Sequence, residues 1–234
     1  ESQSDRLPAM MAGHSLGEYT ALVCAGAIEF EDAVALVEKR ADAMQNAVPE
    51  GSGAMAAILG LDDDQVKSVC EQAAQGEVVS AVNFNSPGQV VIAGNTAAVG
   101  RAMDLAKQEG ARRALLLPVS VPSHCSLMQP AAQTFAADLA AISIRAPAIQ
   151  VLHNVDVASH DQPDTIREAL AAQLFKPVRW VETVRAMQGA GLSCILEMGP
   201  GKVLAGLTRR IDKSMQGIPV QSAEDIESAL AALQ

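Results

Sequence analysis

A serine flanked by glycines is the first feature of this chain that could do chemistry. Positions 13–17 read Gly-His-Ser-Leu-Gly, with an apolar stretch before them and a helical pattern after them. Between a strand and a helix, Gly-x-Ser-x-Gly makes a sharp turn that exposes the serine hydroxyl. The sequence therefore predicts that Ser15 is a nucleophile and that the backbone N–H of Leu16, at the helix start, donates to an oxyanion.

A serine hydroxyl needs a base, and the chain contains four histidines. His14 adjoins the serine, and its side chain is expected to diverge from it. His124 follows an apolar segment at a predicted strand end, where the catalytic groups of α/β sheets collect, and we rank it first. His153 also lies at a strand end and His160 lies in a polar loop. A structural role stays open for each of the four.

Two polar residues lie on the apolar faces of predicted helices. Arg40 shares a helical stripe with Ala33, Val37 and Met44. A buried, unpaired guanidinium is costly, so this placement predicts a carboxylate partner from the protein or from a substrate. The alternative is an arginine at the helix edge whose head reaches water. Gln173 lies on an inward helix face, where an unsatisfied amide would be costly.

Composition limits the class of protein. The chain is 49% hydrophobic and only 3% aromatic, with a mean hydropathy of +0.16, which favours one or two compact α/β domains. No apolar run is long enough for a membrane span and no signal peptide is recognisable, so a cytoplasmic location is expected. The net charge of −10 argues against nucleic acid and membranes as partners. The four scattered cysteines predict no metal site or disulfide.

Two kinds of pattern alternate along the chain. In its middle, the predicted order is β-α-β-β-α-β, with the turn of a hairpin at 85–88, which is the ferredoxin-like arrangement. The elements are a strand at 54–59, a helix at 63–74, strands at 78–84 and 89–93, a helix at 96–108 and a strand at 112–119. Longer α/β units flank this stretch, with helices at 18–27, 32–46, 127–141, 163–175, 178–188, 202–212 and 223–233, and strands at 149–154 and 194–198. We expect a small domain at 51–119, inserted into a larger α/β domain formed by 1–50 and 120–234.

Four motifs in this order carry a family resemblance. They are Gly-His-Ser-Leu-Gly-Glu from position 13, Val-Asn-Phe-Asn-Ser-Pro-Gly-Gln-Val-Val-Ile-Ala-Gly from 82, Pro-Val-Ser-Val-Pro-Ser-His ending at 124, and Glu-Met-Gly-Pro-Gly-Lys-Val-Leu from 197. With them, almost the whole chain closely resembles the bacterial malonyl-CoA:acyl carrier protein transacylases. The resemblance implies an α/β-hydrolase-like large domain that carries an inserted ferredoxin-like small domain, in agreement with the pattern above.

The resemblance also implies roles for single residues. Ser15 would be the malonylated nucleophile, His124 the general base, and Arg40 the partner of the malonyl carboxylate. Gln173 matches a family glutamine whose backbone carbonyl orients the imidazole in place of a triad aspartate. Leu16 matches the residue whose N–H lines the oxyanion hole, and leucine at this position resembles the malonyl-selective members.

The reaction implied by the resemblance is a ping-pong transfer. Ser15 would attack the malonyl-CoA thioester, and the phosphopantetheine thiol of acyl carrier protein would then take the malonyl group. Asn83 falls in a segment flanking the acyl and pantetheine channel, and His14 is counted with the substrate-binding residues. No metal or redox cofactor is implied, the partners are malonyl-CoA and acyl carrier protein, and a monomer is expected.

One departure from the family and two rival interpretations remain. Family members have a first strand and a Gly-Gln-Gly-Ser loop well before the serine motif, and the loop glutamine is a second oxyanion donor. Neither precedes Ser15 here, so we expect this polypeptide to lack that strand and that donor. A serine esterase or thioesterase could use the same motif, with Asp156 as its acid, although Arg40 argues against it. The other rival is an inactive acyltransferase fragment that binds proteins.

Overall fold

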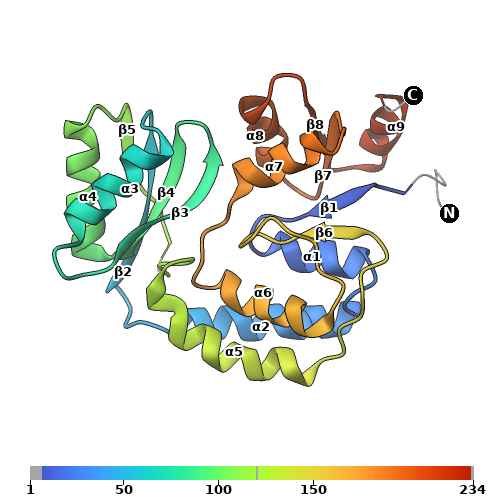
Figure 1. Ribbon diagram of the computed structural model, residues 1–234, viewed down its shortest axis with the longest axis horizontal. Coiled ribbons are helices and arrows are strands. Elements are labelled where there is room, and N and C mark those ends of the chain that lie inside the picture. The colour runs from blue at the N-terminus through green and yellow to red at the C-terminus, as the bar shows by residue number, and fades with distance from the viewer. Residues whose placement is uncertain (1–6, 120, 233–234) are drawn as a thin grey trace.

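The computed structural model describes residues 7–119 and 121–232 and has a mixed α/β architecture. Figure 1 shows two parts side by side: a sheet covered by two helices, and a larger assembly of helices around short parallel strands. The chain enters the larger part, crosses to the sheet, and returns. The residues of both ends of the described chain lie in the larger part.

The smaller part has the element order that the sequence predicted. Its elements are β2 (Gly53–Leu59), α3 (Asp63–Ala74), β3 (Val79–Ser86), β4 (Gln89–Asn95), α4 (Thr96–Gln108) and β5 (Arg113–Leu116). All its strand pairs are antiparallel, in the order β3-β4-β2-β5. Both helices pack on the sheet through small apolar side chains. The apolar stripe of each helix contacts the apolar residues that alternate along the strands.

Local signals set the boundaries of this part. The predicted bounds of α3 and α4 are confirmed, and α3 begins with a capping box in which Asp62 and Gln65 exchange hydrogen bonds. The hairpin turn is shorter than predicted, because β3 continues to Ser86 and only Pro87 and Gly88 lie between the strands. Gly88 has a φ of +73°, which glycine adopts without strain.

The larger part contains two pairs of parallel strands among its helices. Its elements are β1 (Met10–Ala12), α1 (Gly17–Cys24), α2 (Phe30–Gln45), the 3-10 turn η1 (Ser126–Met128), α5 (Gln129–Ala141), β6 (Gln150–Leu152), α6 (Pro163–Gln173), α7 (Trp180–Gly189), β7 (Cys194–Met198), α8 (Val203–Ile211), β8 (Gln216–Val220) and α9 (Ala223–Ala232). β1 pairs with β6, and β7 pairs with β8. The sequence analysis missed β8, since its Gly217 and Pro219 are unfavourable in strands.

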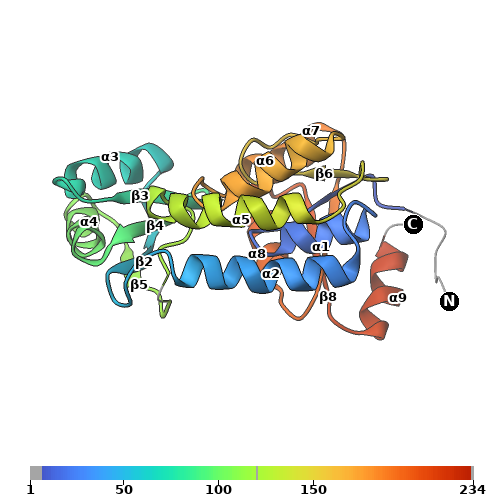
Figure 2. The same ribbon diagram turned by 90° about the horizontal axis from the view of Figure 1, so that it is seen from below.

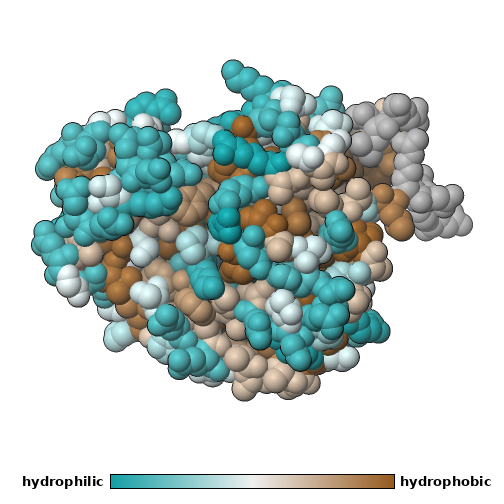
Figure 3. Space-filling model, in the orientation of Figure 1, coloured by the Kyte–Doolittle hydropathy of each residue, from teal (hydrophilic) through white to brown (hydrophobic). Residues whose placement is uncertain are grey.

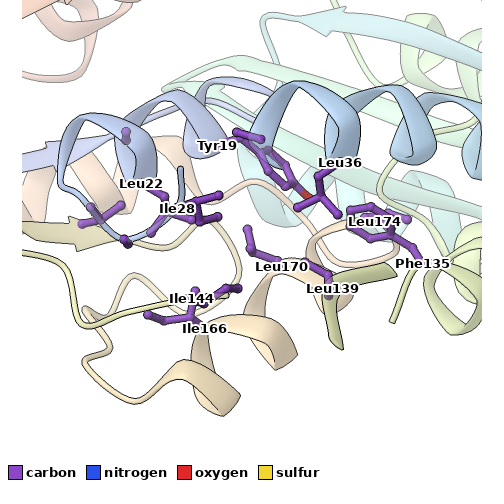
Figure 4. Close-up of a cluster of buried hydrophobic side chains, with 14 of the residues drawn as sticks. Tyr19, Leu22, Ile28, Leu36, Phe135, Leu139, Ile144, Ile166, Leu170 and Leu174 are labelled. Carbon is purple, nitrogen blue, oxygen red and sulfur yellow. The ribbon is translucent and has the colours of Figure 1, made fainter. Parts of the chain in front are cut away.

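Helices α1, α2, α5 and α6 enclose the apolar core of the larger part. Figure 2 shows α2 and α5 running alongside each other, and Figure 4 shows large side chains from all four helices meeting between them. The rings of Tyr19 and Phe135 contact edge to face, with centroids 6.4 Å apart. This packing fixes α1, α2 and α6 relative to one another, and these helices carry the polar residues of the site.

Polar side chains cover most of the upper region of the smaller part on the face seen in Figure 3. Figure 3 shows hydrophilic side chains over α3 and β3, whereas apolar side chains gather near the middle of the same face, around β1 and β7. Among the residues that the structure describes, no helix combines the length and the apolar character that crossing a bilayer requires.

Candidate active site

The chain makes a sharp turn at Ser15, between β1 and α1. Ser15 has a φ of +53°, an uncommon value for a residue with a side chain. A side chain at Gly13 could not fit, because its Cβ would lie 1.9 Å from the carbonyl carbon of Gly17. Asn154, two residues after the end of β6, holds the turn: its Oδ1 accepts from Ser15 N at 2.7 Å and its Nδ2 donates to Gly13 O at 2.7 Å. The sequence thus forms the strained serine turn that its glycines predict.

His124 is the histidine that meets the serine. Its Nε2 lies 2.9 Å from Ser15 Oγ, and its Nδ1 lies 2.7 Å from the backbone carbonyl oxygen of Gln173. A carbonyl oxygen only accepts hydrogen bonds, so the ring proton sits on Nδ1 and leaves the Nε2 lone pair facing the hydroxyl. In this tautomer His124 can accept the proton of Ser15.

The charge state of His124 fits the same role. Burial, and after it the positive charge of Arg40, together lower the pKa of His124 to about 3. The side chain is therefore neutral at ordinary pH, as a proton acceptor must be. His124 itself has a φ of +66°, and its N–H donates to Leu174 O at 2.9 Å, so the backbone holds the ring in place.

Arg40 reaches the serine from α2. Only 8% of the residue is exposed, which argues against an arginine at the helix edge whose head is freely solvated. Its Nη2 donates to Ser15 Oγ at 2.9 Å and to Gln173 Oε1 at 3.0 Å, whereas its Nε is buried without a partner. Within the described ranges, no Asp or Glu carboxylate forms an ion pair with this guanidinium. Of the two partners that the sequence left open, a protein carboxylate and a substrate carboxylate, the first is therefore not in direct contact with Arg40 in these ranges.

Gln173, at the end of α6, joins the other polar groups of the site. Its backbone carbonyl accepts from His124, and its side-chain oxygen accepts from Arg40. Its side-chain nitrogen donates to Ser15 O at 3.1 Å and to Glu18 Oε2 at 2.9 Å. This fully buried amide thus has partners on both sides, which answers the question that its position on an inward helix face raised.

Leu16 lies directly after the serine, at the start of α1. The first N–H groups of a helix have no partner within the helix. Within residues 7–119 and 121–232, the Leu16 N–H donates to no protein acceptor. The residue is 54% exposed. The N–H is therefore free of a protein acceptor beside Ser15, and its role as an oxyanion donor stays a prediction.

His14 and Asn83 are placed differently from Leu16. As expected, the His14 side chain diverges from the serine: its Nε2 lies 2.8 Å from Asn85 Oδ1 on β3, and its ring lies 5.6 Å from that of Trp180. Burial lowers the pKa of His14. Asn83 also lies on β3; among the described residues its buried Oδ1 has no partner, and no hydrogen bond joins it to Ser15 or His124.

The remaining histidines do not reach the serine. His153 is buried with its Nδ1 2.7 Å from Glu18 Oε1, and His160 Nε2 lies 2.8 Å from Asp156 Oδ2. The assignment of Asp156 as a triad acid is therefore wrong, because the Gln173 carbonyl occupies the position of that acid beside His124. In the described part of the chain, no three His, Cys, Asp or Glu side chains gather as a metal site would require.

Sequence reasoning missed three residues that complete the arrangement. Glu18 and Asn154 are fully buried beside the serine turn, and Asn85 anchors His14 from the smaller part. Glu18 stands within the Gly-His-Ser-Leu-Gly-Glu motif, and the other buried residues of α1 are Tyr19, Ala21 and Leu22, so a charged residue on this face was a visible signal. Asn154 is the last residue of the strand predicted at 149–154 and lies two residues after β6, and no comparable signal pointed to it.

Comparison with known proteins agrees with this geometry. Residues 4–229 match the family model described as acyl transferase domain, so the chain is an acyltransferase. The malonyl CoA-acyl carrier protein transacylase of Escherichia coli strain K12 is 57% identical over 99% of this chain and 74% of its own length, and that of Bacillus subtilis strain 168 is 43% identical over 99% and 74%. The solved structure of the Coxiella burnetii transacylase has 53% identity and a TM-score of 0.96, over 97% of this chain and 72% of its own. The chain belongs to the family of malonyl CoA-acyl carrier protein transacylases.

A further solved structure is relevant to partners. It is described as a type II PKS acyl-carrier protein in complex with its malonyl-transacylase. That transacylase is 52% identical to this chain, with a TM-score of 0.95 over 97% of this chain and 74% of its own. A relative with the same fold thus binds its carrier protein directly.

Proposed function

We propose that this chain transfers the malonyl group of malonyl-CoA to the phosphopantetheine thiol of acyl carrier protein, through a malonyl ester on Ser15. The observation that carries the proposal is the meeting of a neutral base and a buried cation on one hydroxyl. His124 Nε2 and Arg40 Nη2 each lie 2.9 Å from Ser15 Oγ. The base can activate the serine, and the cation can hold a carboxylate next to it. The relatives that match this chain carry the name of this activity.

The two half-reactions use the same groups. Ser15 Oγ attacks the thioester carbon while its proton moves to His124 Nε2, and the carbon–sulfur bond then breaks as the CoA sulfur takes that proton. In the second half, the carrier thiol gives its proton to His124 and attacks the ester carbon. The serine oxygen leaves and recovers the proton. The Leu16 N–H is the proposed donor to the oxyanion in both halves.

Arg40 gives the reaction its preference for an acidic acyl group. A guanidinium that is nearly buried and has no carboxylate partner in the described protein attracts a substrate carboxylate strongly. The same charge lowers the pKa of His124, so a carboxylate bound at Arg40 offsets the charge and makes His124 a stronger base. Binding of the correct substrate and activation of the serine are then linked electrostatically.

Gln173, His14 and Asn83 have supporting roles in this proposal. Gln173 orients His124 through its carbonyl, in a dyad that needs no triad aspartate. His14 is held toward β3 by Asn85, which places it beside the approach to Ser15 from the smaller part. Asn83 lies on the same strand, and its unpaired Oδ1 could accept a hydrogen bond from an amide of the pantetheine arm.

We further infer a division into two domains that matches the family pattern. The antiparallel sheet with its order β3-β4-β2-β5 and two covering helices supports a ferredoxin-like small domain at 51–119. The strand–serine turn–helix arrangement supports an α/β-hydrolase-like large domain formed by 1–50 and 120–234. The absence of a cofactor, a monomeric state and a cytoplasmic location stay predictions.

Intact mass spectrometry after incubation with malonyl-CoA tests the proposal directly. The parent protein should gain the mass of one malonyl group, and a Ser15→Ala variant should gain none. Transfer of the adduct to added phosphopantetheinylated carrier protein should then restore the original mass. A folded parent that forms no adduct, or an adduct that persists in Ser15→Ala, would contradict the proposal.

A further inference from the structure

We propose that Glu18 is a positioning residue for malonyl transfer: it holds the side-chain amide of Gln173 in the one orientation that places Arg40 at Ser15. This inference rests on the proposed function. It concerns a carboxylate that touches neither the serine hydroxyl nor the catalytic imidazole. The effect on malonyl preference that we propose for it runs through Gln173.

Glu18 is fully buried, and its carboxyl group faces three nitrogen atoms. Its Oε2 accepts from Asn154 N at 3.0 Å and from Gln173 Nε2 at 2.9 Å, and its Oε1 lies 2.7 Å from His153 Nδ1. Two N–H donors therefore converge on one oxygen of the group, and one of them is the Gln173 amide.

The contacts of Gln173 show why this carboxylate matters. The two ends of the amide face groups of opposite character, with Glu18 and the Ser15 carbonyl on one side and the Arg40 guanidinium on the other. Turning the amide over would set its oxygen against two acceptors and its NH₂ against a donor. Because the carboxylate is the strongest of these partners, it does the most to fix the orientation.

Arg40 depends on that orientation for its position. Its Nη2 is held by only two acceptors among the described residues, the Gln173 side-chain oxygen and Ser15 Oγ. Since Ser15 Oγ must leave this contact when it attacks a thioester, Gln173 Oε1 is the acceptor that persists. Without Glu18, the amide can turn over and present its NH₂, and the guanidinium then loses that acceptor.

The decisive measurement is kcat/KM for acylation of Ser15 by malonyl-CoA and by acetyl-CoA in each variant. Glu18→Ala should lower the malonyl value roughly 10- to 100-fold, because misplacing a binding group by about 1 Å has effects of this size. The acetyl value should stay within about threefold of the parent, since acetyl has no carboxylate to meet Arg40. A structural defect of the whole site would lower both values together, and that result would overturn the proposal.

Conservative and double variants separate positioning from charge. Glu18→Gln keeps an oxygen for Gln173 Nε2, and its NH₂ can donate to His153 Nδ1 in the tautomer that carries the ring proton on Nε2. It should therefore restore the malonyl preference to within about fivefold of the parent. In a Gln173→Ala background, Glu18→Ala should change the preference no further, because the residue through which it acts is gone. A Glu18→Gln variant as impaired as Glu18→Ala, or additive effects in the double variant, would refute the inference.

Two further measurements keep the inference testable in every case. If Glu18→Ala does not fold, Glu18→Asp replaces it: the shorter side chain withdraws the carboxylate from Gln173, so the malonyl preference must still fall. Crystal structures of the variant and parent give a readout besides activity, with the Arg40 Nη2 to Ser15 Oγ contact expected to be lost. An intact contact would overturn the inference, whereas a parent that takes up no malonyl would overturn the proposed function alone.

Discussion

The smaller part and the Ser15 region bury their side chains in opposite ways. The core under the four-stranded sheet consists only of apolar side chains, most of them Ala and Val, and within residues 51–119 only Ser86 is both buried and polar. Beside Ser15, the buried groups include four ionisable side chains and two amides. These are Glu18, Arg40, His124, His153, Asn154 and Gln173.

The difference indicates that the smaller part is packed for stability, whereas the Ser15 region is arranged for the reaction. Apolar side chains gain from burial in any direction, so a core of small hydrophobic residues tolerates change in proportion to the volume lost. A buried polar network is favourable only when each donor meets an acceptor. Changes in the two regions should therefore differ in kind: loss of stability in one, loss of rate or selectivity in the other.

Replacing the base should have the largest effect. His124→Ala removes the acceptor for the serine proton, and a positioned base contributes roughly 10²- to 10⁴-fold to a rate. We expect the rate of Ser15 malonylation, followed by rapid-quench mass spectrometry, to fall by about 10³-fold or more. His160→Ala, which changes a histidine bonded to Asp156 instead, is the matched control and should leave the rate unchanged. Equal losses in the two variants would contradict the role of His124.

Replacing the cation should change selectivity as well as rate. Arg40→Ala removes the proposed partner of the malonyl carboxylate, and losing one side of a buried charged pair weakens binding by roughly 2–5 kcal/mol. We expect kcat/KM for malonyl-CoA to fall about 10²- to 10³-fold and the preference to shift toward acetyl-CoA. Lys39→Ala, next in sequence and bonded to Asp138 at the surface, should leave both unchanged. An unaltered malonyl preference in Arg40→Ala would defeat the assignment.

A cavity in the smaller part should lower stability and spare the chemistry. Ile58 is fully buried in β2, and truncating it to alanine should lower the free energy of unfolding by about 3 kcal/mol. Urea unfolding checks the stability, and the malonylation rate of the folded variant should match that of the parent. Val34→Ala, at an exposed position of α2, is the control and should change stability by less than about 0.5 kcal/mol. A cavity variant that is stable but inactive would break the distinction between the regions.

The buried histidine should give the Ser15 region a pH dependence of its own. The pKa of His124 is about 3 in the folded protein against an ordinary 6.5, so between these pH values the unfolded chain binds a proton at His124 that the folded chain does not bind. Above pH 6.5 the protonation of this group therefore costs no stability. Below pH 6.5 the free energy of unfolding decreases as pH falls, by at most about 1.4 kcal/mol per pH unit. Urea unfolding of the parent and of His124→Gln at several pH values checks this, since the variant should show the smaller slope. Parallel slopes would contradict the lowered pKa.

The smallest effect is expected where the rival interpretation places an acid. Asp156 accepts hydrogen bonds from Ala158 N and His160, and it has no contact with His124. Asp156→Asn should therefore leave the malonylation rate within about twofold of the parent, since it removes no group from the site. A large loss of rate would show that Asp156 acts as a triad acid and belongs to the polar network around Ser15.

The sequence was most informative where structure is local. The bounds of α3, α4 and β7 were predicted as they occur, because helical stripes, strand alternation and a capping box are written in consecutive residues. The strand β8 was missed because it pairs with β7 through tertiary contacts and because its composition is not typical of a strand. The turn at Ser15 was also predictable, since its glycines are a local requirement of the backbone.

The sequence by itself determined the order of most of the elements, the turn that carries Ser15 and the ranking of His124 first among the candidate bases. Only the tertiary structure decided which groups meet: it joined the Gln173 carbonyl to His124, turned His14 toward Asn85, left Asn83 apart, and brought Glu18 against Gln173. The physical reason is one of distance along the chain. Propensity and periodicity act over a few residues, whereas Ser15 and Gln173 are separated by 158 positions and are brought together only by the packing of α1, α2 and α6.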